Sequence, residues 1–316
     1  METVAQLVPR LTAEELRRFS QEIHQAVASL YRVNRWYGWS RLALLIGLLF
    51  IGGWMYWRAD HWTLSLAGLV VLALAESALL IATHEALHGT LLALPRWEFL
   101  FSCLVSWPMA CPSCTYGLVH LWHHRWNSVD LRDPERIPVC RRPWLKRILG
   151  SGGIGLIVST VHQGLLLRHE DPRLPWRLGW DAAGIFLLHT SILWLVIAQG
   201  VFGRYVLSWL IVERIVGAIL QSRALVEHWG LWHPRQNHLL SQLYGSRTIG
   251  VNYFFNQLTG GLPYHSVHHA CPNLPSHSLP EACERIDKLL KDYRLPSLPY
   301  SRNYPMAIAS LFKRST

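Results

Sequence analysis

Residues 62–88 have the sequence WTLSLAGLVVLALAESALLIATHEALH, an apolar run that ends in two histidines four residues apart. An apolar helix of about 20 residues is long enough to cross a bilayer. Residues four apart lie on one face of a helix, so His84 and His88 point the same way. The stretch therefore predicts a membrane-spanning helix that carries two imidazoles to one membrane face.

Two further histidine clusters and one single histidine follow along the chain. The clusters share the spacing HxxHH, and the single histidine ends another apolar run. Imidazole is a ligand that suits iron, zinc and copper. Because one ion does not take nine ligands, the set predicts two metal ions. The nine candidate ligands are His84, His88, His120, His123, His124, His228, His265, His268 and His269.

The composition is that of an integral membrane protein. Hydrophobic residues make up 51% of the 316 residues and charged residues 16%, and the mean hydropathy is +0.16. The sixteen tryptophans agree with this, because indole favours the membrane interface. Four stretches are long and apolar enough to cross a bilayer, which predicts an all-α protein with about four transmembrane helices. They are residues 42–57, 62–83, 180–202 and 205–226.

The distribution of Lys and Arg predicts the orientation of these spans. The segment before the first span holds six, residues 84–179 hold eleven and residues 223–316 hold ten, whereas the two short connections hold only Arg58 and Arg204. Positive charge stays on the cytoplasmic side, so both termini and the long middle segment are expected there. All nine histidines then meet at the cytoplasmic face. The net charge of +10 follows mostly from this rule and does not indicate nucleic-acid binding.

The remaining apolar segments predict helices that do not cross the membrane. Residues 97–119 must make an even number of crossings to keep His120 beside His84, and Pro108 and Pro112 favour a shallow hairpin. Residues 154–167 contain several polar side chains and predict a helix at the membrane surface. Residues 1–41 predict an amphipathic helix on the cytoplasmic leaflet, since Thr12 and Glu15 form a capping-box pattern before apolar residues at helical spacing. We expect a single domain over residues 1–316, with its core at residues 42–290.

Two other classes of protein use similar patterns. His84-Glu85-Ala86-Leu87-His88 matches HExxH, in which two histidines hold zinc and the glutamate is the base of a metalloprotease. An intramembrane zinc protease would leave the two HxxHH clusters unexplained. A metal sensor or transporter would favour ionisable residues along a transmembrane path, whereas here the histidines gather at one face.

The order HxxxH, HxxHH, single His, HxxHH resembles the membrane fatty acid desaturase and hydroxylase superfamily, in particular its bacterial branch. Arg223-Ala-Leu-Val-Glu227-His228 resembles the R-x-x-x-E-H element of many bacterial members, and the segment 125–134 resembles the one that follows their second histidine cluster. The resemblance implies a cytoplasmic histidine-rich cap with two iron ions, with dioxygen as co-substrate. It implies action on a fatty-acyl chain in the bacterial inner membrane. Desaturation is expected first, and hydroxylation or oxidative decarboxylation to a terminal alkene are the alternatives.

The third cluster departs from the family pattern. It follows Pro263-Tyr264, where many acyl-lipid desaturases have asparagine before tyrosine, and it has Val267 where they have glutamate. The ligands are kept, so the departure concerns the substrate and not the metals.

Several polar residues are expected near the metals or in the substrate path. Ligating histidines need their second ring nitrogen oriented, commonly by a carboxylate or carbonyl. The candidates are Glu85, Glu227, Asp130 and Asp133, together with Asn252 and Asn256 for a metal-bound water. Charges inside a span are costly, so Glu76 and Arg214 are candidates for the substrate channel, or for an ion pair between two spans.

Electrons must come from a separate protein. The sequence has no cytochrome b5 segment, no ferredoxin cysteine run and no dinucleotide fingerprint, so a ferredoxin-type carrier with its reductase is expected. A basic segment that includes Arg132, Arg136, Arg141, Arg142, Lys146 and Arg147 would suit an acidic donor, although the positive-inside rule explains it equally well. Cys111 and Cys114 form an isolated CxxC pair, which does not predict a zinc site.

Overall fold

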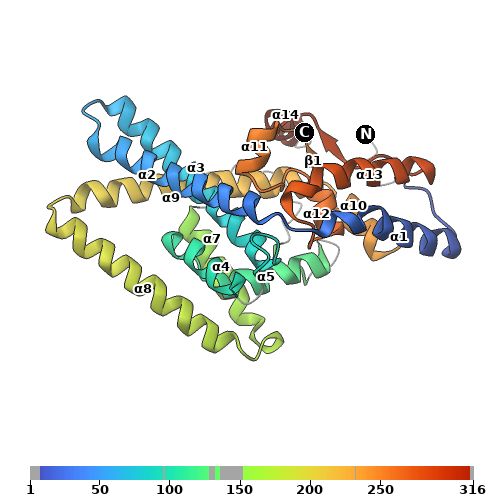
Figure 1. The fold of residues 1–316 in the computed structure, drawn as a ribbon, viewed down its shortest axis with the longest axis horizontal. Coiled ribbons are helices and arrows are strands. Elements are labelled where there is room, and N and C mark those ends of the chain that lie inside the picture. Colours follow the sequence, from blue (N-terminus) through green and yellow to red (C-terminus); the bar gives the residue numbers. More distant parts are fainter. Residues whose placement is uncertain (1–7, 95–96, 128–131, 136–151, 232, 314–316) are drawn as a thin grey trace.

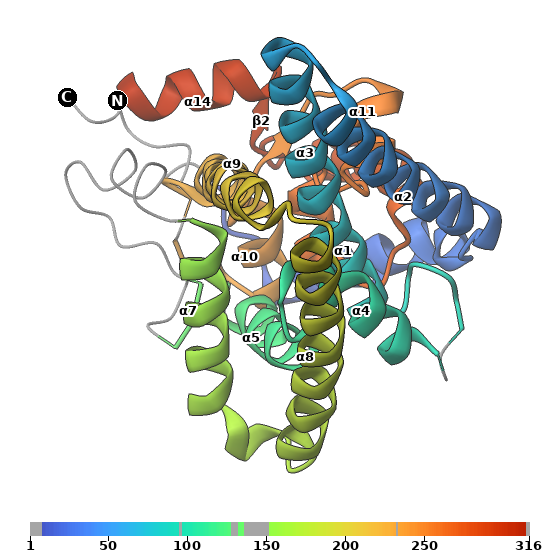
Figure 2. The ribbon, with the colours of Figure 1, turned by 90° about the vertical axis from the view of Figure 1, so that its left-hand side faces the viewer.

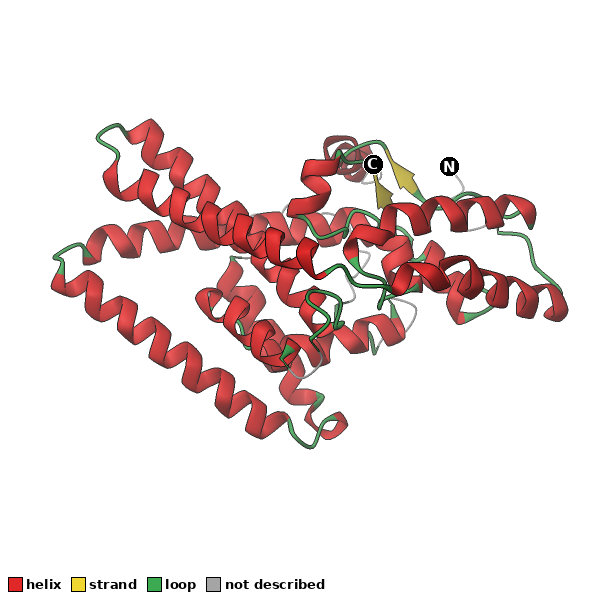
Figure 3. Cartoon of the chain, viewed as in Figure 1, coloured by secondary structure: helices red, strands yellow, loops and turns green. Residues whose placement is uncertain are grey.

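The computed structural model describes residues 8–94, 97–127, 132–135, 152–231 and 233–313, and every structural statement below refers to these residues. Helices make up most of this part of the chain, together with one short pair of strands (Figure 3).

Four helices are long and apolar enough to cross a membrane, as predicted. They are α2 (Arg35–Arg58), α3 (Trp62–Leu87), α8 (Leu174–Ala198) and α9 (Phe202–His228). Figure 1 shows α2, α3 and α9 running side by side, away from a cap of shorter helices at which both ends of the chain lie. The protein is therefore an all-α integral membrane protein.

Helices α2 and α3 pack closely because two glycines face each other. A Cβ atom on Gly52 would lie 2.9 Å from the carbonyl oxygen of Gly68, and one on Gly68 would lie 2.7 Å from that of Gly52. Small residues allow helices in a membrane to approach until their backbones touch. This contact fixes α3, whose last turn carries the first two histidines.

The segment expected to form a hairpin is broken where its prolines lie. Helix α4 (Glu98–Ser106) leads into the 3-10 turn η3 (Trp107–Met109), and α5 (Ser113–Trp126) follows Pro112. The helix α7 (Gly153–Leu166) matches the predicted segment 154–167 and packs against α5 and α9. Neither α4 nor α5 is long enough to cross a bilayer.

Helix α8 diverges from α9 beyond their connection and is held by the hairpin instead (Figures 1 and 2). The buried carboxylate of Asp181 accepts hydrogen bonds from the Trp107 indole nitrogen at 2.8 Å and from the Cys114 amide at 3.0 Å. His189 Nε2 lies 2.9 Å from the carbonyl oxygen of Trp107. These polar contacts fix α8 against η3 and α5.

The predicted amphipathic helix exists, but the expectation that it lies on the cytoplasmic leaflet is wrong. Helix α1 (Ala13–Val27) begins with the Thr12–Glu15 capping box. Its apolar residues Phe19, Ile23 and Val27 are fully buried in a core shared with α10 (His238–Tyr244) and α13 (Leu279–Asp292). A helical apolar stripe is buried equally well by protein or by lipid, and here protein covers it.

The other short elements complete the cap. Strand β1 (Thr248–Ile249) pairs in parallel with β2 (Tyr300–Ser301), and α14 (Tyr304–Lys313) packs on the end of α9. The remaining elements are η2 (Ala28–Tyr31), η4 (Arg168–Glu170), α11 (Tyr253–Leu258), α12 (His265–Ala270) and η5 (Ser276–Ser278). Helix α12 carries the third histidine cluster and packs against α10 and α13.

Candidate metal centre

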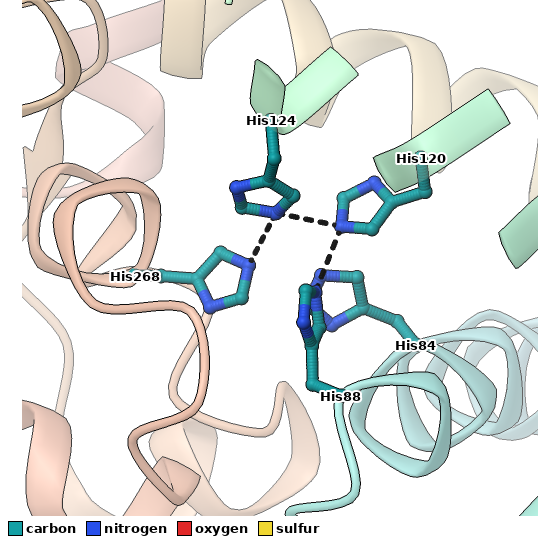
Figure 4. A group of neighbouring side chains, drawn as sticks. All are labelled: His84, His88, His120, His124 and His268. Carbon is teal, nitrogen blue, oxygen red and sulfur yellow. Dashed lines mark hydrogen bonds between the residues drawn. The ribbon is translucent and has the colours of Figure 1, made fainter. Parts of the chain in front are cut away.

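The nine histidines converge from four helices into two neighbouring groups. Within each group the potential ligand atoms all lie within 4.8 Å of one another. The first group is His84, His88, His120, His124 and His268 (Figure 4), and the second is His123, His228, His265 and His269.

The HxxHH spacing explains how one short helix serves both groups. His120 and His124 are four residues apart on α5 and both face the first group, whereas His123 between them faces the second. On α12 the pair His265 and His269 faces the second group and His268 the first. A spacing of four keeps two side chains on one helical face, and the intervening histidine is rotated away from them. Each HxxHH cluster therefore divides its candidate ligands between the two groups, whereas His84 and His88 both belong to the first.

The end of α3 positions the first pair. Helix α3 ends at Leu87, and Gly89 follows in the left-handed conformation with φ +68°. Glycine adopts this conformation without the penalty that a Cβ atom brings, and it commonly ends a helix. The chain leaves the helix directly after His88, which keeps both imidazoles at its end.

The ring nitrogens in each group face one another. In the first group His120 Nε2 lies 2.8 Å from His124 Nε2 and 3.1 Å from His88 Nε2 (Figure 4). In the second group His265 Nε2 lies 2.9 Å from His228 Nε2 and 3.1 Å from His269 Nε2. Lone pairs that face each other repel unless a proton or a cation lies between them. Several such contacts around one point fit a bound cation better than they fit shared protons.

The protonation states agree with this. Burial, and then the neighbouring imidazoles, lower the pKa of His124, His268 and His269 well below the usual histidine value. These imidazoles are therefore neutral near pH 7, which is the form that binds metals. Both ring nitrogens of His84 are also buried and have no hydrogen-bond partner among the described residues. Such orphaned nitrogens fit metal ligands and are costly otherwise.

His123 differs because carboxylates surround it. Burial opposes its charged form, but Asp133 and Glu135 outweigh burial and raise the pKa of His123 to about 9. Desolvation also opposes the charge on Glu135, although its side chain is 36% exposed, yet His123 and His120 lower the pKa of Glu135 to about 2. A cation in the second group would replace the proton on His123 and leave Asp133 as the acceptor for its other nitrogen.

Three of the candidate ligand histidines are oriented by acceptors at their Nδ1 atoms. His123 Nδ1 lies 3.0 Å from an Asp133 oxygen, His228 Nδ1 lies 3.2 Å from the carbonyl oxygen of Gly245, and His269 Nδ1 lies 3.1 Å from Gln242 Oε1. An acceptor at Nδ1 holds the proton there and leaves Nε2 to face the group. The prediction for Asp133 matches this geometry.

Sequence reasoning missed Gln242. Its amide nitrogen donates to the carbonyl oxygen of His124 at 2.7 Å, while its oxygen accepts from Asn127 at 2.8 Å. One buried amide thereby links α5, α10 and α12 around both groups. No motif marks this residue, because its role arises from the packing of α10 against α12.

Glu85 does not orient a histidine, contrary to the prediction. Its carboxylate forms a buried ion pair with Arg41 of α2, and the Arg41 guanidinium also contacts the carbonyl oxygens of Ala78 and Leu258. Glu85 lies between the two histidines in sequence but on another face of the helix. The HExxH match therefore lacks the geometry of a protease base.

Of the two asparagines expected to hold a metal-bound water, Asn252 has another role, and the role of Asn256 stays a prediction. Asn252 is exposed and caps α11 by accepting a hydrogen bond from the Phe255 amide at 2.8 Å. Asn256 is buried, and no hydrogen bond joins its side chain to a described histidine. Asp130 lies outside the described residues, as do five of the six predicted basic-face residues, all except Arg132.

Glu227 lies next to the second group. Its Oε2 atom is 3.5 Å from His265 Nε2 and 3.5 Å from the Nε atom of Arg223, one turn earlier on α9. The Glu227 side chain is almost completely buried.

A cavity of about 460 Å³ reaches the histidines from within the helical bundle. His120, His123, His228 and His265 line one part of it, and Glu76 of α3 and Glu213 of α9 line another. Arg214 lies elsewhere: it lines a second, apolar cavity of about 740 Å³, and its Nε atom is 2.8 Å from Glu213 rather than paired with Glu76. Ile81, Leu220 and Arg223 line both cavities.

Comparison with known proteins identifies similarity to one family. A family model described as fatty acid desaturase matches residues 60–301, a range that includes all nine histidines. Fatty acid desaturase 3 of Bos taurus is 22% identical over 249 residues, which are 71% of this chain and 55% of that protein.

Two further relatives are named for sphingolipids. A protein named sphingolipid delta(4)-desaturase DES1-like from Arabidopsis thaliana is 24% identical over 206 residues, 64% of this chain and 57% of that protein. Ceramide hydroxylase of Caulobacter vibrioides is 24% identical over 310 residues, 87% of this chain and 88% of that protein. The chain spans little more than half the length of the two desaturases, and most of the hydroxylase.

Proposed function

The chain belongs to the fatty acid desaturase family, and we propose that it oxidises a fatty-acyl chain of a membrane lipid with dioxygen at two iron ions. Family membership and the four apolar helices support an integral membrane oxidoreductase of lipid metabolism. The metal, the co-substrate and the reaction on the acyl chain are the proposal. Among the possible reactions, desaturation is the one we propose first.

The nine histidines would hold the irons, five around one and four around the other. When bound, two irons supply the oxidising power that removal of hydrogen from an unactivated carbon requires. The chain's own side chains hold the imidazoles in place: Asp133 and Gln242 fix two of them through Nδ1. Helices carry eight of the nine and His88 caps the end of α3, and rigid elements hold a site more precisely.

The observation that carries the proposal is the cavity shared by histidines and membrane-spanning helices. It is lined by His120, His123, His228 and His265 at the cap, and by residues of α3 and α9 within the spans. Glu76 lies about 12 Å along α3 from His84, at 1.5 Å per residue. An acyl chain lying in this cavity would reach the histidines from between the spans, without crossing water.

Hydroxylation is the second candidate, because ceramide hydroxylase aligns with the chain over most of both lengths. Both reactions begin with removal of one hydrogen atom from the chain. Oxidative decarboxylation to a terminal alkene remains a third possible outcome of the same step, and it requires a free fatty acid.

We further propose that residues 1–316 act as one domain, with both termini and the metal centre on the cytoplasmic side of a bacterial inner membrane. The positive-inside distribution supports this orientation. A ferredoxin-type carrier with its reductase would supply electrons from the cytoplasm.

The proposal is tested by mass spectrometry of total lipids and volatiles from a bacterial host that expresses the chain. A lipid that has lost two hydrogen atoms identifies a desaturase, and one that has gained an oxygen atom identifies a hydroxylase. A volatile alkene one carbon shorter identifies a decarboxylase. The control is His123→Ala, which removes a ligand of the second group. A wild-type lipid profile identical to this control would contradict the proposed function.

A further inference from the structure

The two groups contain different numbers of histidines, and this difference points to a further ligand. The first group offers five imidazoles and the second only four. Iron bound by histidines and carboxylates commonly takes more than four ligands. The inference below rests on the proposed function, since it concerns the metal that the second group would hold.

Glu227 is positioned to fill the second group. Its Oε2 atom lies 3.5 Å from His265 Nε2, the same nitrogen that lies 2.9 Å from His228 Nε2 and 3.1 Å from His269 Nε2. Glu227 is the residue directly before His228, so the last turn of α9 fixes both side chains together. The carboxylate also lines the cavity that reaches the histidines.

Its surroundings leave the carboxylate short of partners. Glu227 is 1% exposed, and neither carboxylate oxygen has a hydrogen-bond partner of normal geometry among the described residues. Arg223 balances its charge at 3.5 Å, and the hydroxyl group of Tyr304 lies beside it as a weak hydrogen-bonding partner. A buried carboxylate with only these loose partners is costly to keep charged, and a metal cation bound to it would lower that cost.

We propose that Glu227 is a carboxylate ligand of the metal in the second group, which makes the two metal sites chemically different. The first site then has imidazole ligands from five histidines, and the second combines four imidazoles with one anionic oxygen.

The other carboxylates near this group fit the role less well. Asp133 already holds the Nδ1 atom of His123 at 3.0 Å. Glu135 is further away, with an oxygen 3.9 Å from His123 Nε2, and its side chain is 36% exposed. Water reaches part of the Glu135 carboxylate, so its charge needs a cation less than that of Glu227, which is 1% exposed.

The test is Mössbauer spectroscopy and iron analysis of the purified full-length protein, loaded with isotopically enriched iron in detergent. Wild type should hold two irons with two distinct signals. Glu227→Gln should lose one iron, or change one signal, while the other signal stays as in wild type. The retained signal shows that the variant is folded. Glu213→Gln, a buried carboxylate of the same helix and cavity, should leave both signals unchanged.

The outcomes separate this inference from the proposed function. Wild type without iron would overturn the proposed function itself. Two irons with unchanged signals in Glu227→Gln would overturn only the assignment of Glu227. The same holds if a signal changes in Glu135→Gln and not in Glu227→Gln. If Glu227→Gln does not give monodisperse protein, Glu227→Asp decides: a shift confined to one signal supports the ligand, and an unchanged spectrum overturns it.

Discussion

At the scale of single residues, spacing predicted which histidines gather but not what surrounds them. In each HxxHH cluster, two histidines four residues apart share a helix face and the third points to a neighbouring face. Two such helices that face each other therefore form two histidine groups. The partner of Glu85 could not be predicted, because Arg41 comes from another helix and the pairing depends on how α2 packs. The same holds for Gln242, which reaches the histidines only through the packing of α10.

Asp133→Asn should weaken metal binding by roughly 10- to 100-fold, the usual effect of losing an acceptor behind a ligating histidine. The amide cannot balance the charge beside His123 as the carboxylate does. Competition with a chelator measures this on purified protein. Asp171→Asn, in an ion pair with Arg177 away from the histidines, is the matched control. Equal affinities for the two variants would show that Asp133 does not support the site.

Glu85→Gln should lower stability strongly, by roughly 3–5 kcal/mol, because it leaves the Arg41 charge buried without its partner. Thermal unfolding in detergent measures the change. The exposed pair of Arg285 and Glu281 supplies the control, since Glu281→Gln should cost less than about 1 kcal/mol. Similar melting temperatures for the two variants would contradict a structural role for Glu85.

At the scale of elements, the apolar pattern predicted the helices better than their partners. Apolar residues recur at helical spacing within residues 16–30, and a helix forms there. The protein core rather than the lipid covers its apolar face. Helix α8 was predicted as a span, whereas its attachment through Asp181 and Trp107 could not be predicted. That contact joins residues far apart in sequence, and spacing carries no signal for it.

Gly184→Ala should destabilise the attachment of α8. A Cβ atom there would lie 2.3 Å from the ring of Trp107, so the indole must move, at a cost of roughly 1–3 kcal/mol. Gly179→Ala on the same helix meets nothing within 4 Å and should be neutral or stabilising by up to about 1 kcal/mol. Melting temperatures in detergent compare the two. A Gly184→Ala protein as stable as Gly179→Ala would contradict this packing.

At the scale of the whole molecule, hydropathy predicted four spans and the histidines predicted a cap at one end of them. Both features follow from local sequence, because a span must be apolar along its length and each cluster occupies one helix turn. The shape of the cavity between α3, α5, α7 and α9 could not be predicted, since it depends on how these helices tilt and pack.

The proposed orientation places the connection of α2 and α3 outside the cell and the cap inside. Asp60→Cys should therefore react with a membrane-impermeant maleimide in intact spheroplasts, whereas Lys288→Cys should react only after lysis. Both positions are exposed, so accessibility alone does not separate them. The unmodified chain measures labelling of its native cysteines. Labelling of Lys288→Cys in intact spheroplasts would reverse the orientation.

The metal content of the purified full-length protein tests the central claim most directly. Elemental analysis of protein produced in iron-sufficient medium should find two irons per chain, because nine imidazoles, eight of them buried, form two separate groups. A single zinc ion per chain would contradict the account and favour a site built on His84 and His88 alone.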